Sequence, residues 1–392
     1  MLVWRSLVTP LPSRNYTQSL LRPLLACAGR QDIKCFQFGW SGETASSFSG
    51  REKNDLGVFR PTVATFCYGM NDGRYVPYAD AIGKEYESNM RSVLTKAREL
   101  GITNMVVGAP GCVDTKYFVK YPNLSPAQYN DSLAHLGEIG RSLASEYKTG
   151  FANVHKELED AMAKAKAALG PDYDVCGRDG IHPQPNGHLL MAAAFLKGLG
   201  VDGTIGEITI DMKGASSGSS GHKTSGSNGV AELESTRYPF CFNGDEKSSS
   251  GTRSILPFCD FNERLNRFIL KVKNLDAAKA KVTWGEESKT FTKEQLTNGI
   301  NLTAEFSKTP FDSAFFQFME GVATKQARET NIIKRLITCF WFFEADIKAD
   351  PELAAAVEVL KIKMLNSQAK LDAAARALLV PVKHTIRLEM LK

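Results

Sequence analysis

The stretch Thr62-Val63-Ala64-Thr65-Phe66-Cys67-Tyr68-Gly69-Met70-Asn71-Asp72 places apolar and β-branched residues directly before a Gly-x-Asn-Asp tetrapeptide. These residues predict a buried strand, because β-branched and aromatic side chains fit a pleated sheet. Asn71 therefore follows the carboxyl end of a strand, where its uncharged amide can donate hydrogen bonds. In open parallel α/β sheets, binding and catalytic groups gather at this end of the strands.

A second predicted strand end lies upstream. The apolar run Ile33–Phe38 leads into Gly39-Trp40-Ser41-Gly42-Glu43-Thr44-Ala45. Gly42 has no side chain to shield its backbone N–H, which can therefore approach a ligand closely. Backbone and amide donors of this kind stabilise the negative oxygen that develops when an acyl group is attacked.

The third segment is Asp179-Gly180-Ile181-His182-Pro183, which stands before an apolar helix pattern. A carboxylate three residues before a histidine can reach the same ring. Asp179 would then fix the tautomer of His182 and stabilise its protonated form. This pair predicts a general base with its orienting acid.

Together the three segments resemble the SGNH (GDSL-like) hydrolase family, and the resemblance covers roughly Cys27–Asp211. It places the family's oxyanion donors on Gly42 and Asn71, and its acid and base on Asp179 and His182. It implies a three-layer α/β/α fold with a flavodoxin-like parallel sheet, a serine nucleophile, and no metal or cofactor. The wording of the first two segments is similar to a bacterial branch that carries an extra C-terminal region.

The Gly-Asp-Ser block that supplies the family's nucleophile is absent. The family spacing places that serine between about Ser6 and Ser13, and Ser6 follows Trp4-Arg5 in place of Gly-Asp. Three interpretations stay open: the chain begins late and lacks its first strand, Ser6 is a degenerate nucleophile, or the protein no longer catalyses. On the first interpretation, the chain as written has little esterase activity.

Ser41 is a further candidate, since Gly39-Trp40-Ser41-Gly42-Glu43 nearly matches the Gly-x-Ser-x-Gly nucleophile elbow of α/β-hydrolases. The fifth residue is Glu43, whose side chain would crowd the strained turn that the elbow requires. An acid only three residues before the histidine is also foreign to that fold. We therefore disfavour Ser41 as the nucleophile.

Composition excludes several classes of function. The 392 residues carry 48 basic and 43 acidic side chains, a net charge of +5, with no concentrated basic patch. Nucleic acid is therefore not expected as a partner. No apolar run is long enough for a membrane span, and the cysteines and histidines lack zinc-ligand spacing. Residues 1–28 form no clear signal peptide, although the resemblance favours a secreted or periplasmic protein.

Alternating strand and helix patterns predict a hydrolase domain over residues 1–205, with a truncated first strand and a helix over Tyr16–Ala28. Residues 206–392 predict an accessory, sandwich-like antiparallel β module with a helical hairpin inserted at about 313–378. Gly214–Gly229 predicts a hairpin turn between two strands, and Ile300–Phe306 predicts another strand.

We expect a serine ester hydrolase, and the resemblance implies acetyl esters of carbohydrates as substrates. The alternative from another class is a noncatalytic glycan-binding or scaffold protein that keeps the fold. The absent Gly-Asp-Ser block favours this alternative, whereas the intact Gly42, Asn71, Asp179 and His182 set favours the enzyme.

Overall fold

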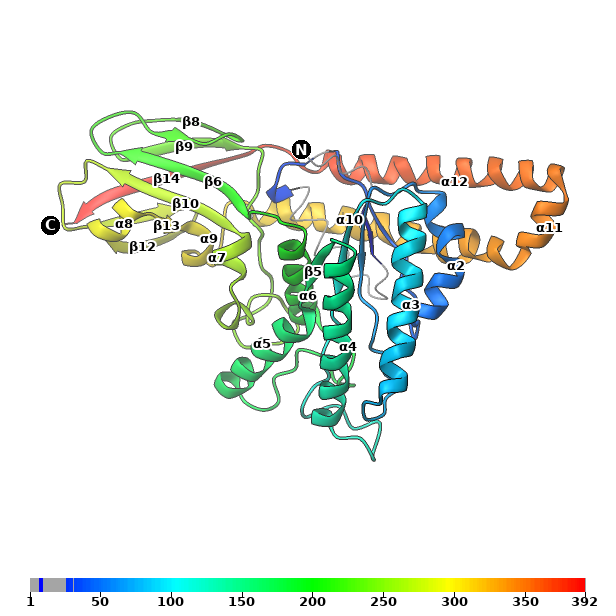
Figure 1. Ribbon diagram of the computed structural model, residues 1–392. Coiled ribbons are helices and arrows are strands. Elements are labelled where there is room, and N and C mark those ends of the chain that lie inside the picture. Colours follow the sequence, from blue (N-terminus) through cyan, green and yellow to red (C-terminus); the bar gives the residue numbers. More distant parts are fainter. Residues whose placement is uncertain (1–6, 10–25, 31, 392) are drawn as a thin grey trace.

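The computed structural model describes residues 7–9, 26–30 and 32–391 (Figure 1). Its first unit is a parallel sheet with the strand order β2-β1-β3-β4-β5. The strands are β1 (Leu7–Thr9), β2 (Cys35–Gln37), β3 (Val63–Phe66), β4 (Asn104–Gly108) and β5 (Gly150–Ala152). The expected parallel α/β sheet is confirmed, and β1 lies between β2 and β3. Ser6 and almost all of the helix expected over Tyr16–Ala28 lie outside the described residues.

Helices cover both faces of this sheet. They are α2 (Ala45–Gly57), α3 (Asp80–Glu99), α4 (Pro126–Glu146), α5 (Val154–Leu169) and α6 (Pro185–Gly198). Alternate residues of each strand point to opposite faces, so Ala64 and Phe66 pack with α2, α3 and α4. Val63 and Val106 pack with α5 and α6 on the other face. The arrangement is the three-layer α/β/α fold.

Helix α2 was not predicted, because the sequence indicated only a short crossover there. Its buried face is unusually polar and includes Ser49, Arg51, Glu52 and Asp55 beside Phe48. A charged face gives no apolar period, so the usual signal of an amphipathic helix is missing. Thr44 caps the helix by accepting a hydrogen bond from the Ser47 amide.

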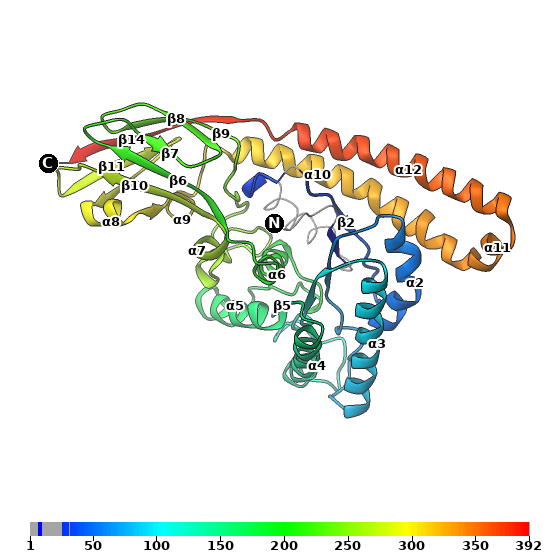
Figure 2. The ribbon, with the colours of Figure 1, turned by 45° about the horizontal axis from the view of Figure 1, so that its top comes forward.

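A helical hairpin covers the open edge of β2. It consists of α10 (Asp312–Ile332), a π-helical turn (Ile333–Ile337), a 3-10 helix (Thr338–Phe343), α11 (Glu344–Ala349) and α12 (Pro351–Ala377). Figure 2 shows α10 and α12 running side by side, with their far end close to α2. The buried Glu329 carboxylate accepts from the Gln37 amide at 3.2 Å, and Lys325 donates to the Cys35 carbonyl. Side chains thus satisfy backbone groups that an edge strand leaves unpaired.

The β-rich region contains two facing sheets, of orders β13-β10-β6-β7 and β12-β11-β14-β9-β8. The first holds β6 (Thr204–Asp211), β7 (Ser217–Gly218), β10 (Arg267–Lys273) and β13 (Ile300–Asn301). The second holds β8 (His222–Ser225), β9 (Val230–Ser235), β11 (Lys279–Trp284), β12 (Glu287–Thr292) and β14 (Val382–Leu391). Phe268 and Trp284 meet between the sheets, with ring centroids 5.8 Å apart. The final strand, β14, returns to this region after the helical hairpin.

Three expectations for this region were wrong. Strands β6 and β9 lie in different sheets, so Gly214–Gly229 does not join them as one hairpin but forms β7 and β8. The region is not wholly antiparallel, since β6 pairs parallel with β10. Ile300–Phe306 is not one strand, because helix α9 (Leu302–Glu305) follows β13 directly. The short helices η2 (Leu256–Phe258), α7 (Phe261–Leu265) and α8 (Lys293–Asn298) complete the region.

None of the helices in the described part of the chain is long and apolar enough to cross a membrane. The boundary between a hydrolase domain over residues 1–205 and an accessory module over residues 206–392 stays a prediction.

Candidate active site

His182 and Asp179 form the predicted pair. The Nδ1 atom of His182 lies 2.6 Å from Asp179 Oδ2, while Asp179 Oδ1 accepts from the Ile181 and His182 amides at 2.9 Å each. Burial acts to raise the pKa of Asp179, but these hydrogen bonds outweigh it and hold the pKa below its usual value. The acid is therefore ionised at neutral pH. The His182 side chain is 65% exposed, which leaves its ring open to a substrate.

Asn71 and Gly42 meet at the neighbouring strand ends. The Asn71 Nδ2 atom donates to the Glu43 carbonyl at 3.1 Å, which places the amide beside the residue that follows Gly42. Gly42 is exposed and has a φ of 75°, a backbone conformation that favours glycine. Among the described residues, no heavy atom beyond its chain neighbours lies within 4 Å of the place that a Cβ would take.

Asp72 joins the Gly42 and Asn71 segments, a role that the sequence did not reveal. Its carboxylate accepts from the Ala45 amide at the start of α2 and from the Gly69 amide, both at 2.9 Å. Asp72 thus fixes the Gly42 turn relative to the Asn71 turn. Its place next to Asn71 in Gly-x-Asn-Asp was the available signal.

The Glu43 side chain anchors the Gly42 turn to α2 and to Tyr68. It accepts from Arg51 Nε at 2.7 Å and from Arg51 Nη2 at 2.8 Å, and Tyr68 donates to it at 3.1 Å. Arg51 also pairs with buried Asp55 and donates to the Phe38 carbonyl at 2.7 Å. This buried network explains why α2 carries charges on its inner face. Nothing in the residue spacing indicated it.

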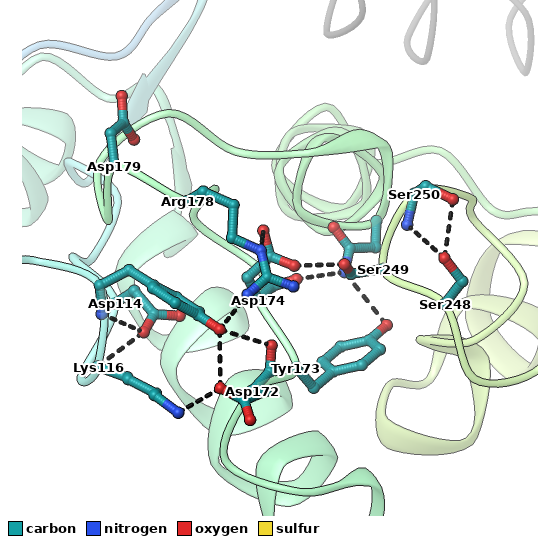
Figure 3. Close-up of polar contacts among 12 residues, drawn as sticks. Asp114, Lys116, Asp172, Tyr173, Asp174, Arg178, Asp179, Ser248, Ser249 and Ser250 are labelled. Atoms are coloured by element: carbon teal, nitrogen blue, oxygen red, sulfur yellow. Dashed lines mark hydrogen bonds and ion pairs between the residues drawn. The ribbon is translucent and has the colours of Figure 1, made fainter.

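The loop that carries Asp179 and His182 contacts the β-rich region (Figure 3). Within this loop the Arg178 guanidinium lies over the Tyr117 ring and near Asp174. Ser249, from the segment between β9 and β10, donates to Asp174, and Ser254 Oγ lies 2.6 Å from the Tyr173 hydroxyl. The Asp114 amide donates to the Gly180 carbonyl at 2.9 Å. The β-rich region is therefore part of what holds this loop.

The nucleophile candidates differ in their relation to the sheet. Gly42 follows the last residue of β2 by five positions, and Asn71 follows the last residue of β3 by five. Ser13 follows the last residue of β1 by four positions, whereas Ser6 precedes that strand. Both serines lie outside the described residues. Ser41 is exposed in the Gly42 turn, and among the described residues it forms no hydrogen bond with His182.

Family comparison agrees with this arrangement. Residues 9–190 match the model of the GDSL-like Lipase/Acylhydrolase family. This segment is a little under half of the chain, and the match confirms its resemblance to GDSL-like hydrolases. The match supports hydrolysis of ester bonds as the class of reaction. No curated protein matches the sequence of the chain.

Solved structures show the extent of the shared fold. BT4096, described as a gut microbial diltiazem-metabolizing enzyme, is 19% identical and superposes with a TM-score of 0.75 over 99% of this chain and 98% of that chain. Axe2, an acetylxylan esterase from Geobacillus stearothermophilus, is 18% identical, with a TM-score of 0.39 over 50% of this chain and 94% of its own. LAE5, an alpha/beta hydrolase enzyme from the metagenome of Lake Arreo, Spain, is 18% identical, with a TM-score of 0.39 over 50% of this chain and 95% of its own. The likeness to BT4096 shows the fold alone, and it includes the β-rich region.

Proposed function

We propose that this GDSL-like protein is a serine ester hydrolase that uses His182 as its general base. The observation that carries the proposal is the 2.6 Å contact between His182 Nδ1 and Asp179 Oδ2. With Nδ1–H donated to the acid, Nε2 is the atom that can take a proton from a serine hydroxyl. The ring later returns that proton to the leaving alcohol.

Gly42 and Asn71 are the proposed oxyanion donors. Their segments are joined by the contact between Asn71 and the Glu43 carbonyl and by the two hydrogen bonds to Asp72. A rigid pair of donors stabilises the charge on the tetrahedral intermediate without reorganising during the reaction. Loss of one such donor costs about 2.7–4 kcal/mol of transition-state stabilisation.

For the nucleophile we rank Ser13 above Ser6. The other site groups come from segments that follow strands, and Ser13 stands in the corresponding place after β1. Leu11-Pro12 precedes Ser13 where the family pattern has Gly-Asp. The serine would attack the ester carbonyl to form an acyl-enzyme, which water then hydrolyses.

The finer substrate proposal is a small acyl ester of a carbohydrate. The side chains of Asp179 and His182 are 53% and 65% exposed, so the acid–base pair is open to a bulky alcohol portion. Trp40, two residues before Gly42, is 37% exposed, and an exposed aromatic side chain can contact a sugar ring.

The testing experiment is turnover of p-nitrophenyl acetate by the full chain and by His182→Ala and Asn71→Ala. We expect both variants to lose most activity while their circular dichroism and melting temperatures stay close to those of the parent. Turnover in His182→Ala equal to that of the parent would contradict the assigned role. A folded parent chain that releases no acid from any small ester would favour the noncatalytic alternative.

A further inference from the structure

The Asn71 side chain has two partners that together define its orientation. Nδ2 lies 3.1 Å from the Glu43 carbonyl, and a carbonyl oxygen only accepts hydrogen bonds. The amide nitrogen must therefore face Glu43. The Tyr75 hydroxyl lies 3.1 Å from the remaining atom, Oδ1, and donates to it. One hydrogen on Nδ2 is left for a further acceptor.

We propose that Tyr75 is a positioning residue whose hydroxyl fixes the Asn71 amide so that its free N–H faces the oxyanion of the ester. This inference rests on the proposed function and deepens it. Without the hydroxyl, Oδ1 loses its donor, and the contact with the Glu43 carbonyl alone holds the amide.

The backbone at Tyr75 supports this assignment. Arg74 and Tyr75 have φ values of 58° and 56°, so two consecutive residues with side chains adopt the left-handed conformation. Such conformations cost roughly 1–3 kcal/mol each, persist only where the surroundings enforce them, and gather at functional sites. Here the chain makes this left-handed turn between Asn71 and Tyr75, and the Tyr75 hydroxyl donates to the Asn71 side chain four residues earlier.

Aromatic packing fixes the ring that carries this hydroxyl. Tyr75 stacks on Tyr121, with centroids 4.5 Å apart and planes 13° apart, and on Tyr129 at 5.0 Å. The Tyr75 amide also donates to the Tyr129 hydroxyl at 3.3 Å. Phe118 completes the group, stacked on Tyr129 at 5.6 Å. The phenol therefore has one well-defined place beside Asn71.

The phenol is a donor at every pH suited to an ester assay. Burial, followed by the nearby Tyr121 and the Asp179 charge, raises the pKa of Tyr75 to about 12. The influence of Asp179 also shows that Tyr75 lies within electrostatic reach of the acid–base pair.

The first test compares Tyr75→Phe with Tyr121→Phe. Both keep a ring in the aromatic stack, but the Tyr121 hydroxyl has no hydrogen-bond partner among the described residues. We expect Tyr75→Phe to lower kcat about 3- to 10-fold at constant KM, the effect of one neutral hydrogen bond expressed in the transition state. Tyr121→Phe should keep kcat within about twofold. Equal losses in the two variants would overturn the assignment.

A double-mutant cycle isolates the route through Asn71. If Tyr75 acts by orienting the amide, Tyr75→Phe has no further effect on kcat in the Asn71→Ala background. If Tyr75 supports the site in another way, its loss lowers the activity of both backgrounds by the same factor, and the proposal is overturned.

A measurement without substrate separates this inference from the proposed function. The Asn71 side-chain amide signals of ¹⁵N-labelled protein are assigned by their loss in Asn71→Ala. We expect Tyr75→Phe to move or broaden these signals and Tyr121→Phe to leave them in place. A parent chain without esterase turnover would contradict the proposed function alone, whereas unchanged Asn71 signals in Tyr75→Phe would contradict the role of Tyr75.

Discussion

The Asp179 carboxylate contacts His182 at two atoms: Oδ2 faces Nδ1 at 2.6 Å, and Oδ1 accepts from the His182 amide and also from the Ile181 amide. The acid thus fixes both the ring and the backbone that carries it. This double contact depends on Gly180, which has a φ of 76°. A Cβ added at this position would collide with the Phe118 backbone.

Asp179→Asn is expected to lower kcat by about 10²–10⁴-fold, and His182→Ala by more, because the acid orients the base but does not itself transfer the proton. Steady-state kinetics of the two variants on one small ester measure this order. A larger loss in Asp179→Asn than in His182→Ala would mean that the carboxylate has a different task.

Ser254→Ala should destabilise the acid–base loop from the β-rich side. It removes the partner that lies 2.6 Å from the Tyr173 hydroxyl, a group buried beside Asn186. We expect a loss of about 1–3 kcal/mol in the free energy of unfolding, together with lower kcat. The control is Ser250→Ala, an exposed serine of the same segment, whose hydrogen bonds within the described residues are with Ser248 alone (Figure 3). Equal melting temperatures for the two variants would exclude this support.

Glu52→Gln should stabilise the protein at alkaline pH. Burial raises the pKa of the Glu52 carboxyl to about 9, and neither carboxyl oxygen has a hydrogen-bond partner. From pH 4.5 to 9 the unfolded chain releases a proton that the folded chain keeps, so stability falls with rising pH, by up to about 1.4 kcal/mol per unit. The melting-temperature advantage of Glu52→Gln over the parent should therefore grow between pH 5 and pH 8. A constant difference would show that the folded protein does not keep the Glu52 carboxyl protonated in this range.

Two buried histidines of the β-rich region predict a loss of stability in acid. Ser235 Oγ lies 2.8 Å from His222 Nδ1 and 2.9 Å from His384 Nε2, and Trp284 donates to His384 Nδ1 at 3.2 Å. Burial lowers the pKa of His384 to about 3, so the folded protein keeps this ring neutral. An unfolded histidine is protonated below about pH 6.5, and stability should therefore fall as the pH drops from 6.5 toward 3.

The measurement is the midpoint of urea unfolding as a function of pH, followed by the fluorescence of the four tryptophans, one of which is Trp284. His384→Leu should be less stable than the parent at pH 7, because Trp284 and Ser235 lose a partner. Its stability should also change less between pH 7 and pH 4. The same pH slope in both proteins would exclude His384 as a source.

The sequence predicted those parts of the site that local patterns determine. Asn71 follows an apolar strand, and Asp179 and His182 are neighbours in the chain, so each could be placed without tertiary information. Helix α2 could not, because its buried face carries Arg51 and Glu52, and a charged face lacks the apolar period that indicates an amphipathic helix. Tyr75 was missed for a different reason: its contact with Asn71 depends on a left-handed backbone that tyrosine seldom adopts.

The β-rich region shows where pattern reasoning fails. Strand β6 is distant in sequence from β10, yet the two pair in parallel, and alternation of apolar residues does not specify a partner. The segment from Leu302 to Glu305 was predicted as part of a strand but forms a helix, and at its start the Asn301 side chain accepts a hydrogen bond from the Phe268 amide. Tertiary contacts decide both cases.

The most direct test of the central claim is labelling of the full chain with a fluorophosphonate, which reacts with an activated serine, followed by intact mass measurement and peptide mapping. We predict one adduct, on Ser13, that is absent in His182→Ala and whose formation removes ester turnover. An adduct on Ser6 or Ser41 would contradict our ranking of the nucleophiles. A folded chain that acquires no adduct and hydrolyses no ester would contradict the assignment of a serine hydrolase.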